Sequence, residues 1–251
     1  MKIWAIFKKE MRLYFTSPVA WVVFTIFLLI AGYFFYSIFA FFTLASMQSM
    51  MNPQMGRDLN VTDSVMRPLF SNVSVILLLL LPLVTMRLFA EERRGGTLEL
   101  LLTSPIREIE IVLAKFTAGL SLSVLMLALT STYAVVLGIY GDPDWGPIYS
   151  GFLGLFLLAA SLTAIGLLVS GLTANQVVAA VVAMGVGILL WMIDTLGYLL
   201  PEPYDTIISQ LSLVGHFTPF ATGALFLSDV GFFLTIVLVG LFLSVRTLAR
   251  R

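Results

Sequence analysis

The sequence predicts an all-α polytopic membrane protein with six transmembrane helices. Apolar residues make up 59% of the chain and charged residues only 11%, against roughly 25% charged residues in an average soluble domain. The mean hydropathy is +1.02. The apolar residues also gather in long uncharged runs, such as residues 73–86 and 116–141. Since a helix needs about 20 apolar residues to cross a bilayer, these runs indicate spans rather than a soluble core.

Six such runs are expected to form one transmembrane domain over residues 1–251. Pro18 suits the first helical position of the first span, and Asp229 suits the N-cap of the last. Pro82 lies inside the second span, where it should kink the helix while a neighbouring helix satisfies the freed carbonyl. The predicted spans are residues 19–42, 68–89, 111–140, 147–170, 176–199 and 229–245.

The distribution of Lys and Arg predicts the orientation. An even number of spans places both termini on one side, and twelve of the 14 basic residues fall on that side. Only Arg57 and Arg67 fall opposite. The positive-inside rule therefore predicts cytoplasmic termini in a multi-pass protein of the bacterial cytoplasmic membrane. The twelve residues are Lys2, Lys8, Lys9, Arg12, Arg87, Arg93, Arg94, Arg107, Lys115, Arg246, Arg250 and Arg251.

Residues 1–17 are predicted to form an amphipathic helix that lies in the cytoplasmic interface. The alternative is a basic tail that only sets the topology. A cleaved signal peptide is not expected, because the apolar run that follows is longer than a signal core. The predicted apolar face holds Ile3, Trp4, Phe7, Met11, Tyr14 and Phe15, and the basic residues Lys2, Lys8, Lys9 and Arg12 surround the other face.

A second segment with a distinct pattern lies before the last span. Residues 211–227 are apolar, but Gly215, Pro219 and Gly223 interrupt them, so the segment is too broken to span. We expect a short re-entrant or interfacial helical hairpin at the outer surface.

Several classes of chemistry lack the residues that they require. The chain has no Cys and one His, which excludes thiolate sites, a histidine metal triad and a serine-type catalytic triad. No G-x-x-x-x-G-K-[ST] phosphate loop occurs. Met47, Met50, Met51 and Met55 would suit copper(I), but methionine also fills loose helix extensions. We predict no catalytic, cofactor or metal residue, and the net charge of zero argues against a nucleic-acid partner.

Three further features have a plain and a sharper interpretation. Ala179, Ala183 and Gly187 recur every fourth residue, which favours close helix packing inside the protein over a subunit interface. Asp194 is expected to be a hydrogen-bonded packing residue rather than a functional acid. His216 is expected to be structural, although a histidine is also able to titrate near neutral pH.

Residues 87–105, RLFAEERRGGTLELLLTSP, form a charged segment between the second and third predicted spans. On a helix, Glu92 and Glu99 share one face, and Leu98 lies on another with Leu101 and Leu102. We expect Glu91 and Glu92 to lie in water, and the leucines to dock into a groove on a soluble partner. The alternative is a solvated loop that only anchors the helix ends.

This segment resembles the signature of permeases of ABC-2-type transporters. The matching runs are RLFAEER from Arg87, GTLELL from Gly96 and TSP from Thr103. A second run, SGLTANQVVAA from Ser170, and a third around His216, Gly223 and Asp229 are also similar to family segments. The short outer loops resemble the branch of gliding-motility and copper-maturation permeases most closely.

The resemblance implies a six-helix permease that forms a homodimer and pairs with two ATP-binding subunits. Those subunits would bind the ATP and Mg²⁺, so no cofactor is expected in this chain. A periplasmic accessory protein and the lipid bilayer are further expected partners. In the family, a coupling helix follows the second span, which corresponds here to residues 91–104. The implied interface residues are Glu91, Glu92, Arg93, Arg94, Gly96, Thr97, Leu98, Glu99, Leu102 and Pro105.

The function that follows is ATP-driven export, with ATP hydrolysed by the separate subunits. One alternative is a scaffold that transmits the ATPase motion to periplasmic partners without moving a substrate. Another is a secondary transporter that acts without ATP, which should carry charges in the middle of its spans or half-helix breaks in repeated halves. The sequence has neither feature.

Overall fold

The computed structural model describes residues 2–51, 60–102, 106–197 and 208–249, and all regular structure in these ranges is helical. The elements are α1 (Lys2–Thr16), α2 (Pro18–Met51), the π-helix η1 (Thr62–Met66), α3 (Arg67–Thr85), α4 (Arg87–Arg94), α5 (Thr97–Leu102), α6 (Glu108–Tyr140), α7 (Trp145–Leu172), α8 (Gln176–Gly197), α10 (Leu213–Ala221) and α11 (Leu227–Ala249).

Within these described ranges, six helical segments are long and apolar enough to cross a membrane, which confirms the predicted number. The helices are longer than the predicted spans; α2, for example, continues past Phe42 to Met51. The second segment is not one α-helix, because α3 stops at Thr85, three residues after Pro82, and α4 begins at Arg87. The segments are Pro18–Ser49, Thr62–Arg94, Glu108–Tyr140, Trp145–Leu172, Gln176–Thr195 and Leu227–Ala249.

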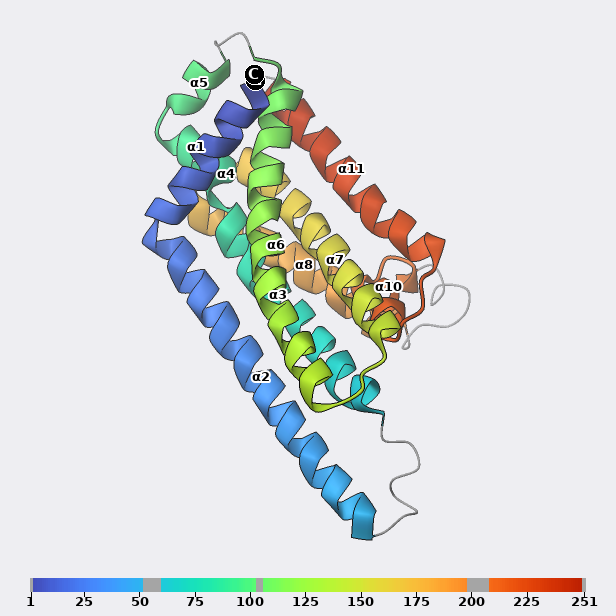
Figure 1. Cartoon of the computed structure of the whole chain (residues 1–251). Helices are drawn as coiled ribbons and strands as arrows, with labels where there is room; N and C mark the ends of the chain where they lie inside the picture. Colours follow the sequence, from blue (N-terminus) through green and yellow to red (C-terminus); the bar gives the residue numbers. More distant parts are fainter. Residues whose placement is uncertain (1, 52–59, 103–105, 198–207, 250–251) are drawn as a thin grey trace.

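Helix α7 lies at the centre of the bundle. In the most apolar stretch of α7, 72% of the residues are buried inside the protein, whereas in the corresponding stretch of α2 only 17% are buried. Glycines on α7 permit the close approach of its neighbours. A Cβ atom at Gly154 would lie 2.5 Å from Cβ of Phe220, and one at Gly166 would lie 2.0 Å from Oγ1 of Thr85. Helix α2 instead lies along the edge of the bundle (Figure 1).

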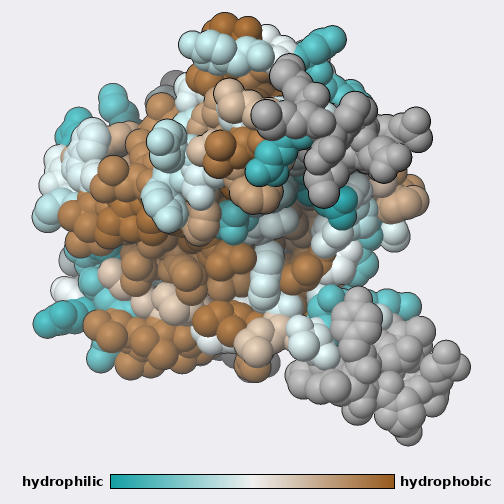
Figure 2. All heavy atoms as spheres, turned by 90° about the horizontal axis from the view of Figure 1, so that it is seen from below, coloured by the Kyte–Doolittle hydropathy of each residue, from teal (hydrophilic) through white to brown (hydrophobic). Residues whose placement is uncertain are grey.

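The hydropathic surface agrees with insertion in a bilayer. Figure 2 shows hydrophobic residues over much of the face in view, with hydrophilic residues mainly toward its margins. Large apolar side chains are exposed along α2, including Trp21, Leu29 and Phe41. In a soluble protein such a surface would favour aggregation or a partner, whereas in a membrane protein lipid covers it.

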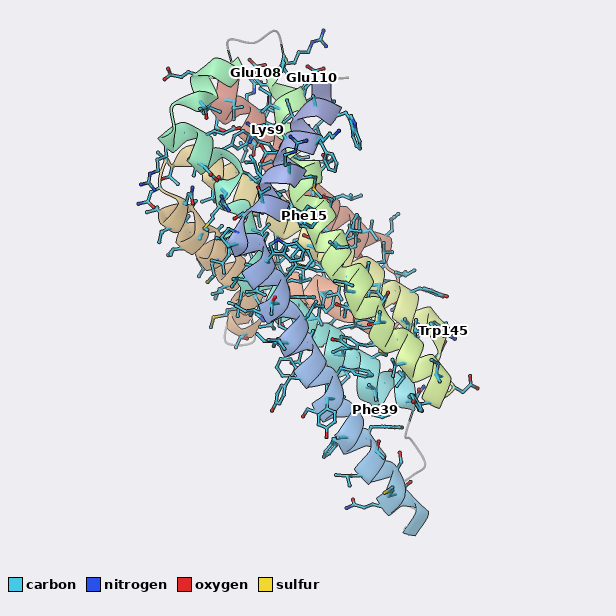
Figure 3. All side chains as sticks on the ribbon, turned by 60° about the vertical axis from the view of Figure 1, so that its left-hand side comes forward. Lys9, Phe15, Phe39, Glu108, Glu110 and Trp145 are labelled. Atoms are coloured by element: carbon cyan, nitrogen blue, oxygen red, sulfur yellow. The ribbon has the colours of Figure 1, made fainter. Side chains whose placement is uncertain are left out.

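One end of the bundle collects α1, α4, α5 and the beginning of α6, together with the C-terminal end of α11 (Figure 1). Figure 3 shows Glu108 and Glu110 at the same end as Lys9, while Phe39 and Trp145 lie toward the opposite end. The predicted charged segment therefore meets the N-terminal helix at one end of the molecule.

The small residues of α8 pack inside the protein, as predicted. Ala179 and Ala183 are buried beside Val169, and a Cβ atom at Gly187 would lie 3.4 Å from Leu162. Asp194 is half-buried on the same helix.

The segment before the last span contains α10, which is held to the bundle at both of its faces. Leu213, Phe217 and Phe220 are buried. On the other side, Nδ1 of His216 lies 2.7 Å from Oδ1 of Asp229, and the His216 ring stacks on Phe232 with 4.0 Å between centroids. His216 thus joins α10 to α11, in agreement with the structural interpretation. Placement of this segment as a re-entrant hairpin stays a prediction.

Asp229 does not cap the last helix. Helix α11 begins two residues earlier, at Leu227, and the carbonyl of Phe226 accepts from the backbone N–H groups of Asp229 and Val230. The Asp229 side chain is buried and faces His216. The N-cap prediction is therefore wrong, because a tertiary contact uses the carboxylate that was expected to cap the helix.

Candidate functional site

The predicted coupling helix consists of two short helices joined by a glycine pair. Helix α4 ends at Arg94, and α5 begins at Thr97. Gly96 has φ of +67°, in the left-handed region that favours glycine. Because the turn changes the chain direction, residues on α4 and α5 do not share the continuous helical faces that the sequence pattern implied.

A hydroxyl group on α7 forms hydrogen bonds with the backbone groups that the break between α3 and α4 leaves unpaired. Oγ of Ser170 accepts hydrogen bonds from the backbone N–H groups of Phe89 and Ala90, both at 3.0 Å, and donates one to the carbonyl of Met86 at 2.8 Å. Ser170 is fully buried. The first N–H groups of a helix lack partners within the helix, so Ser170 takes the role that a cap usually fills. The C-terminal end of α7 is thereby fixed to the start of α4.

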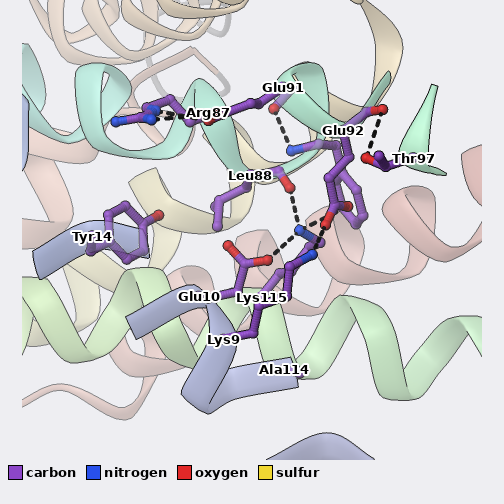
Figure 4. Close-up of polar contacts among 12 residues, drawn as sticks. Lys9, Glu10, Tyr14, Arg87, Leu88, Glu91, Glu92, Thr97, Ala114 and Lys115 are labelled. Carbon is purple, nitrogen blue, oxygen red and sulfur yellow. Dashed lines mark hydrogen bonds and ion pairs between the residues drawn. The ribbon is translucent and has the colours of Figure 1, made fainter. Parts of the chain in front are cut away.

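A buried lysine connects three helices at the same end of the bundle. Lys115 belongs to α6 and is 1% exposed. Its Nζ atom lies 2.6 Å from Oε1 of Glu10 on α1, 3.0 Å from Oε2 of Glu92 on α4, and 2.5 Å from the carbonyl oxygen of Leu88. The dashed lines in Figure 4 mark these contacts. Glu10 and the Leu88 carbonyl accept hydrogen bonds from this ammonium, and Glu92 lies within ion-pair distance, so the buried charge is compensated.

A second, partly exposed lysine balances the remaining negative charge of the two glutamates. Nζ of Lys9 lies 2.7 Å from Oε1 of Glu92. Burial lowers the pKa of Lys9, but the hydrogen bond and the charge of Glu92 raise it by more, so the pKa stands above its ordinary value. Glu10 and Glu92 thus face Lys115 and Lys9, two acids against two bases. We refer to these four residues as the Lys115 network.

The structure divides the predicted interface residues into exposed and buried sets. Glu91, Arg94, Gly96, Thr97 and Glu99 are exposed, and Arg93 is half-buried. The side chain of Leu102 and all of Pro105 lie outside the described residues.

Two expectations about this segment are wrong. Glu92 does not lie in water, because it is 8% exposed and contacts Lys115. Leu98 is 6% exposed and belongs to the core of the chain itself, so it is not presented to a partner. Of the neighbouring acids Glu91 and Glu92, only Glu91 is exposed. It forms a surface ion pair with Arg87, one helical turn earlier, with 2.9 Å between Oε2 and Nε.

Helix α1 covers Lys2–Thr16, and its place in the membrane interface stays a prediction. Its buried stripe is Ile6, Glu10 and Tyr14, at spacings of four residues, whereas Trp4 and Phe15 of the predicted apolar face are exposed. The stripe packs on α6, and the Tyr14 hydroxyl donates to the carbonyl of Val84 at 3.3 Å. Burial raises the pKa of Tyr14.

Glu10, Lys115 and Ser170 were not predicted as site residues. The sequence pattern identified Lys115 only as one of the basic residues that set the topology, although a lysine a few residues inside a predicted span is costly unless it is paired. Glu10 lies four residues from both Ile6 and Tyr14, and this helical spacing indicates that the three residues share one face of α1. Nothing in the sequence pairs Glu10 with Lys115, because 105 residues separate them.

The network borders a pocket of about 260 Å³ between α1, α4 and α6. Its lining includes Lys9, Tyr14, Arg87, Glu91 and Thr97. Within the described residues, no cluster of His, Cys, Asp and Glu is arranged to hold a metal ion.

Comparison with protein families finds one that covers most of the chain. The model of the family described as ABC-2 family transporter protein matches residues 4–221, from α1 to the end of α10. The match includes the break at Met86, the charged segment and the whole Lys115 network. No curated protein matches the chain.

Replacement of Lys115 by Met should destabilise the protein strongly. The change leaves two buried carboxylates without their shared cation, and breaking a buried pair in this way costs about 3–5 kcal/mol. We expect the temperature of aggregation in detergent, followed by size-exclusion chromatography after heating, to fall by roughly 10 °C. The additional changes Glu10→Gln and Glu92→Gln should restore most of the loss, and Lys9→Met should have a small effect. Equal loss for Lys9→Met and Lys115→Met would contradict the assignment.

Replacement of Ser170 by Ala should cost about 1–3 kcal/mol, because two buried N–H groups at the start of α4 lose their acceptor. The matched control is Ser244→Ala, since Ser244 is equally buried but donates only to the carbonyl of Gly240 in its own helix. The same heating assay compares the two variants. If both are equally stable, Ser170 does not hold the helix break.

Proposed function

The chain belongs to the ABC-2 family of transporter proteins, and we propose that this permease subunit of an ABC transporter works as an ATP-driven exporter. In this proposal, separate ATP-binding subunits hydrolyse ATP, and their closure displaces α4 and α5. The displacement passes to the membrane helices and alternates their access to the two sides. The family match and the six apolar segments support the role of a membrane subunit.

The attachment of the charged segment is the observation that carries the proposal. Helices α4 and α5 present exposed charges at Glu91, Arg94 and Glu99. On the inner side, Lys115 holds α4 to α1 and α6, and Ser170 holds it to α7. A force on the exposed side therefore acts on the bundle through short polar contacts rather than through a free loop.

We assign different roles to the residues of the proposed coupling interface. Glu91, Arg94, Gly96, Thr97 and Glu99 contact the ATP-binding subunit, and Arg93, Leu102 and Pro105 complete the segment. Glu92 and Leu98 act from within, since their burial fixes the segment to the chain.

The assembly that we propose contains two copies of this chain and two ATP-binding subunits, with a periplasmic accessory protein as a further partner. Most Lys and Arg residues lie on the same side as the termini and the charged segment. This distribution supports cytoplasmic termini and a cytoplasmic coupling segment in the bacterial inner membrane. The resemblance of the short outer loops is the support for the branch of gliding-motility and copper-maturation permeases.

ATPase activity should require a separate subunit. We expect the purified chain to hydrolyse no ATP, because it lacks the loop that binds the nucleotide phosphates. A phosphate-loop ATPase should co-purify with the chain and hydrolyse ATP in the complex. The assay is phosphate release by the chain, the ATPase and the complex. Hydrolysis by the chain alone, at a level that survives repeated purification, would refute this proposal.

Labelling of single cysteines should reveal the orientation. The natural chain has no cysteine, so no background must be removed. Asp142 and Gly95 are exposed. Asp142 follows the last residue of α6, whereas Gly95 lies between α4 and α5 at the opposite end of the bundle (Figure 1). A membrane-impermeant thiol reagent applied to intact cells should label Asp142→Cys and leave Gly95→Cys unlabelled until the cells are opened. The reverse pattern would invert the topology.

Charge reversal of exposed acids should weaken docking without unfolding the chain. We expect Glu91→Lys with Glu99→Lys to raise the dissociation constant for the ATPase roughly ten-fold or more at low salt, with a smaller effect at high salt. The matched control is Asp142→Lys, an exposed acid at the other end. Binding is measured by titration of the labelled ATPase, and heating reports stability. Unchanged binding by the double variant would move the interface away from this segment.

A further inference from the structure

A hydrophobic groove of about 210 Å³ lies between α2 and α6, next to the end of α1. Its long walls come from Phe24 and Leu28 on α2 and from Leu122 and Leu129 on α6. Phe15 and Trp21 close the end nearest α1, with their rings edge to face at 5.9 Å. Figure 3 places Phe15 at the end of α1 beside α6.

The surface of the groove is almost entirely hydrocarbon. Its two side chains with polar atoms have internal partners: the indole N–H of Trp21 donates to the carbonyl of Phe15 at 2.9 Å, and the hydroxyl of Thr25 donates to the carbonyl of Trp21 at 2.8 Å. Both hydrogen-bond donors on these walls are therefore already used within the chain. A hydrocarbon chain would lose no hydrogen bond by lying there and would gain close van der Waals contact with these walls.

The groove opens toward the surface that lipid covers. Leu122 is buried at its floor, whereas Trp21, Leu125 and Leu129 are exposed at its sides. Both α2 and α6 are among the segments long and apolar enough to span the membrane. An acyl chain of the surrounding bilayer therefore reaches the groove by lateral diffusion, without crossing protein.

Two basic residues lie on the same side of α1 as Phe15, which closes one end of the groove. Lys8 and Arg12 are exposed on α1, and their spacings of seven and three residues from Phe15 put all three side chains on one strip of the helix. Neither Lys8 nor Arg12 has an ion-pair partner in the part of the chain that the structure describes. Their charge is available for an anion at the membrane surface.

A second groove, on the other side of α2, lacks this combination. It has about 270 Å³ and is lined by apolar residues such as Val22, Ile26 and Leu83. Met86 lies at its border, and the next residue, Arg87, already contacts Glu91 and the hydroxyl of Ser17. The two grooves thus differ in available positive charge rather than in apolar surface.

We propose that the groove between α2 and α6 is a binding site for an anionic phospholipid. One acyl chain lies along the groove, and the phosphate group is held by Lys8 and Arg12. The bound lipid fastens α1 to the membrane on the side away from the Lys115 network. This site depends on the insertion of α2 and α6 in a bilayer and not on ATP-driven transport, so its failure would leave the proposed function standing.

Native mass spectrometry of the full-length chain in detergent tests the proposal. The protein is titrated with phosphatidylglycerol or with phosphatidylcholine of the same acyl chains. We expect one phosphatidylglycerol to be retained in preference to phosphatidylcholine. Lys8→Gln and Arg12→Gln should each weaken its retention about five-fold, from the usual attraction of one basic residue near an anionic surface. Arg246→Gln, which removes an exposed charge from α11 at the same end, is the control and should have no effect.

A second pair of variants tests the groove itself. Leu125→Trp should fill it and abolish preferential retention, whereas Val22→Trp adds the same group to the other groove and should have no effect. Both positions are exposed, so folding should survive. Equal retention of the two lipids would overturn the proposal. If the glutamine variants lose phosphatidylglycerol but Leu125→Trp does not, surface charge alone explains the retention, and the proposal is overturned. The proposal is also overturned if Leu125→Trp loses both lipids equally while Arg12→Gln has no effect.

Discussion

The burial of one ammonium group constrains this end of the molecule more than any other single interaction. Lys115 lies where α6 enters the apolar bundle, and an unpaired charge there would be costly. The compensation comes from Glu10 on α1 and from Glu92 and the Leu88 carbonyl on α4. Helix α1 must therefore pack on α6 in the observed register, and α4 must turn its Glu92 face inward. The exposed face of the charged segment follows from this requirement.

The second constraint is the break after α3. An uninterrupted helix through Met86 would carry Glu92 in a different direction, and an interrupted one leaves N–H groups that need acceptors. Ser170 satisfies two of them, and Gly166, one turn earlier on α7, gives Thr85 the room to approach. Helix α4 is thus attached to the central helix α7 through Ser170, and to α1 and α6 through Glu92. This double attachment supports the proposal that α4 and α5 receive force from an ATPase.

Hydropathy and charge predict the coarse structure well, because the cost of exposing backbone and charge to lipid leaves few alternatives. The six spans and the inward packing of Ala179 and Ala183 are cases of this kind. The details of the site depend on contacts between distant residues. Periodicity placed Leu98 on an apolar face, but it did not indicate that the chain's own core covers that face. The position of the break was also hidden, since Pro82 lies inside α3 and the helix ends only where Ser170 supplies its hydroxyl.

The central claim is that the Lys115 network transmits displacement from the ATPase to the membrane helices, and ATP-dependent labelling at the far end tests it most directly. A single cysteine at Asp142 is placed in the natural protein and in the variant with Lys115→Met, Glu10→Gln and Glu92→Gln, each in complex with the ATPase. If the account is right, ATP changes the rate of thiol labelling in the first complex, and the change is largely lost in the second although the ATPase stays bound and active. An equal ATP-dependent change in both complexes would contradict it.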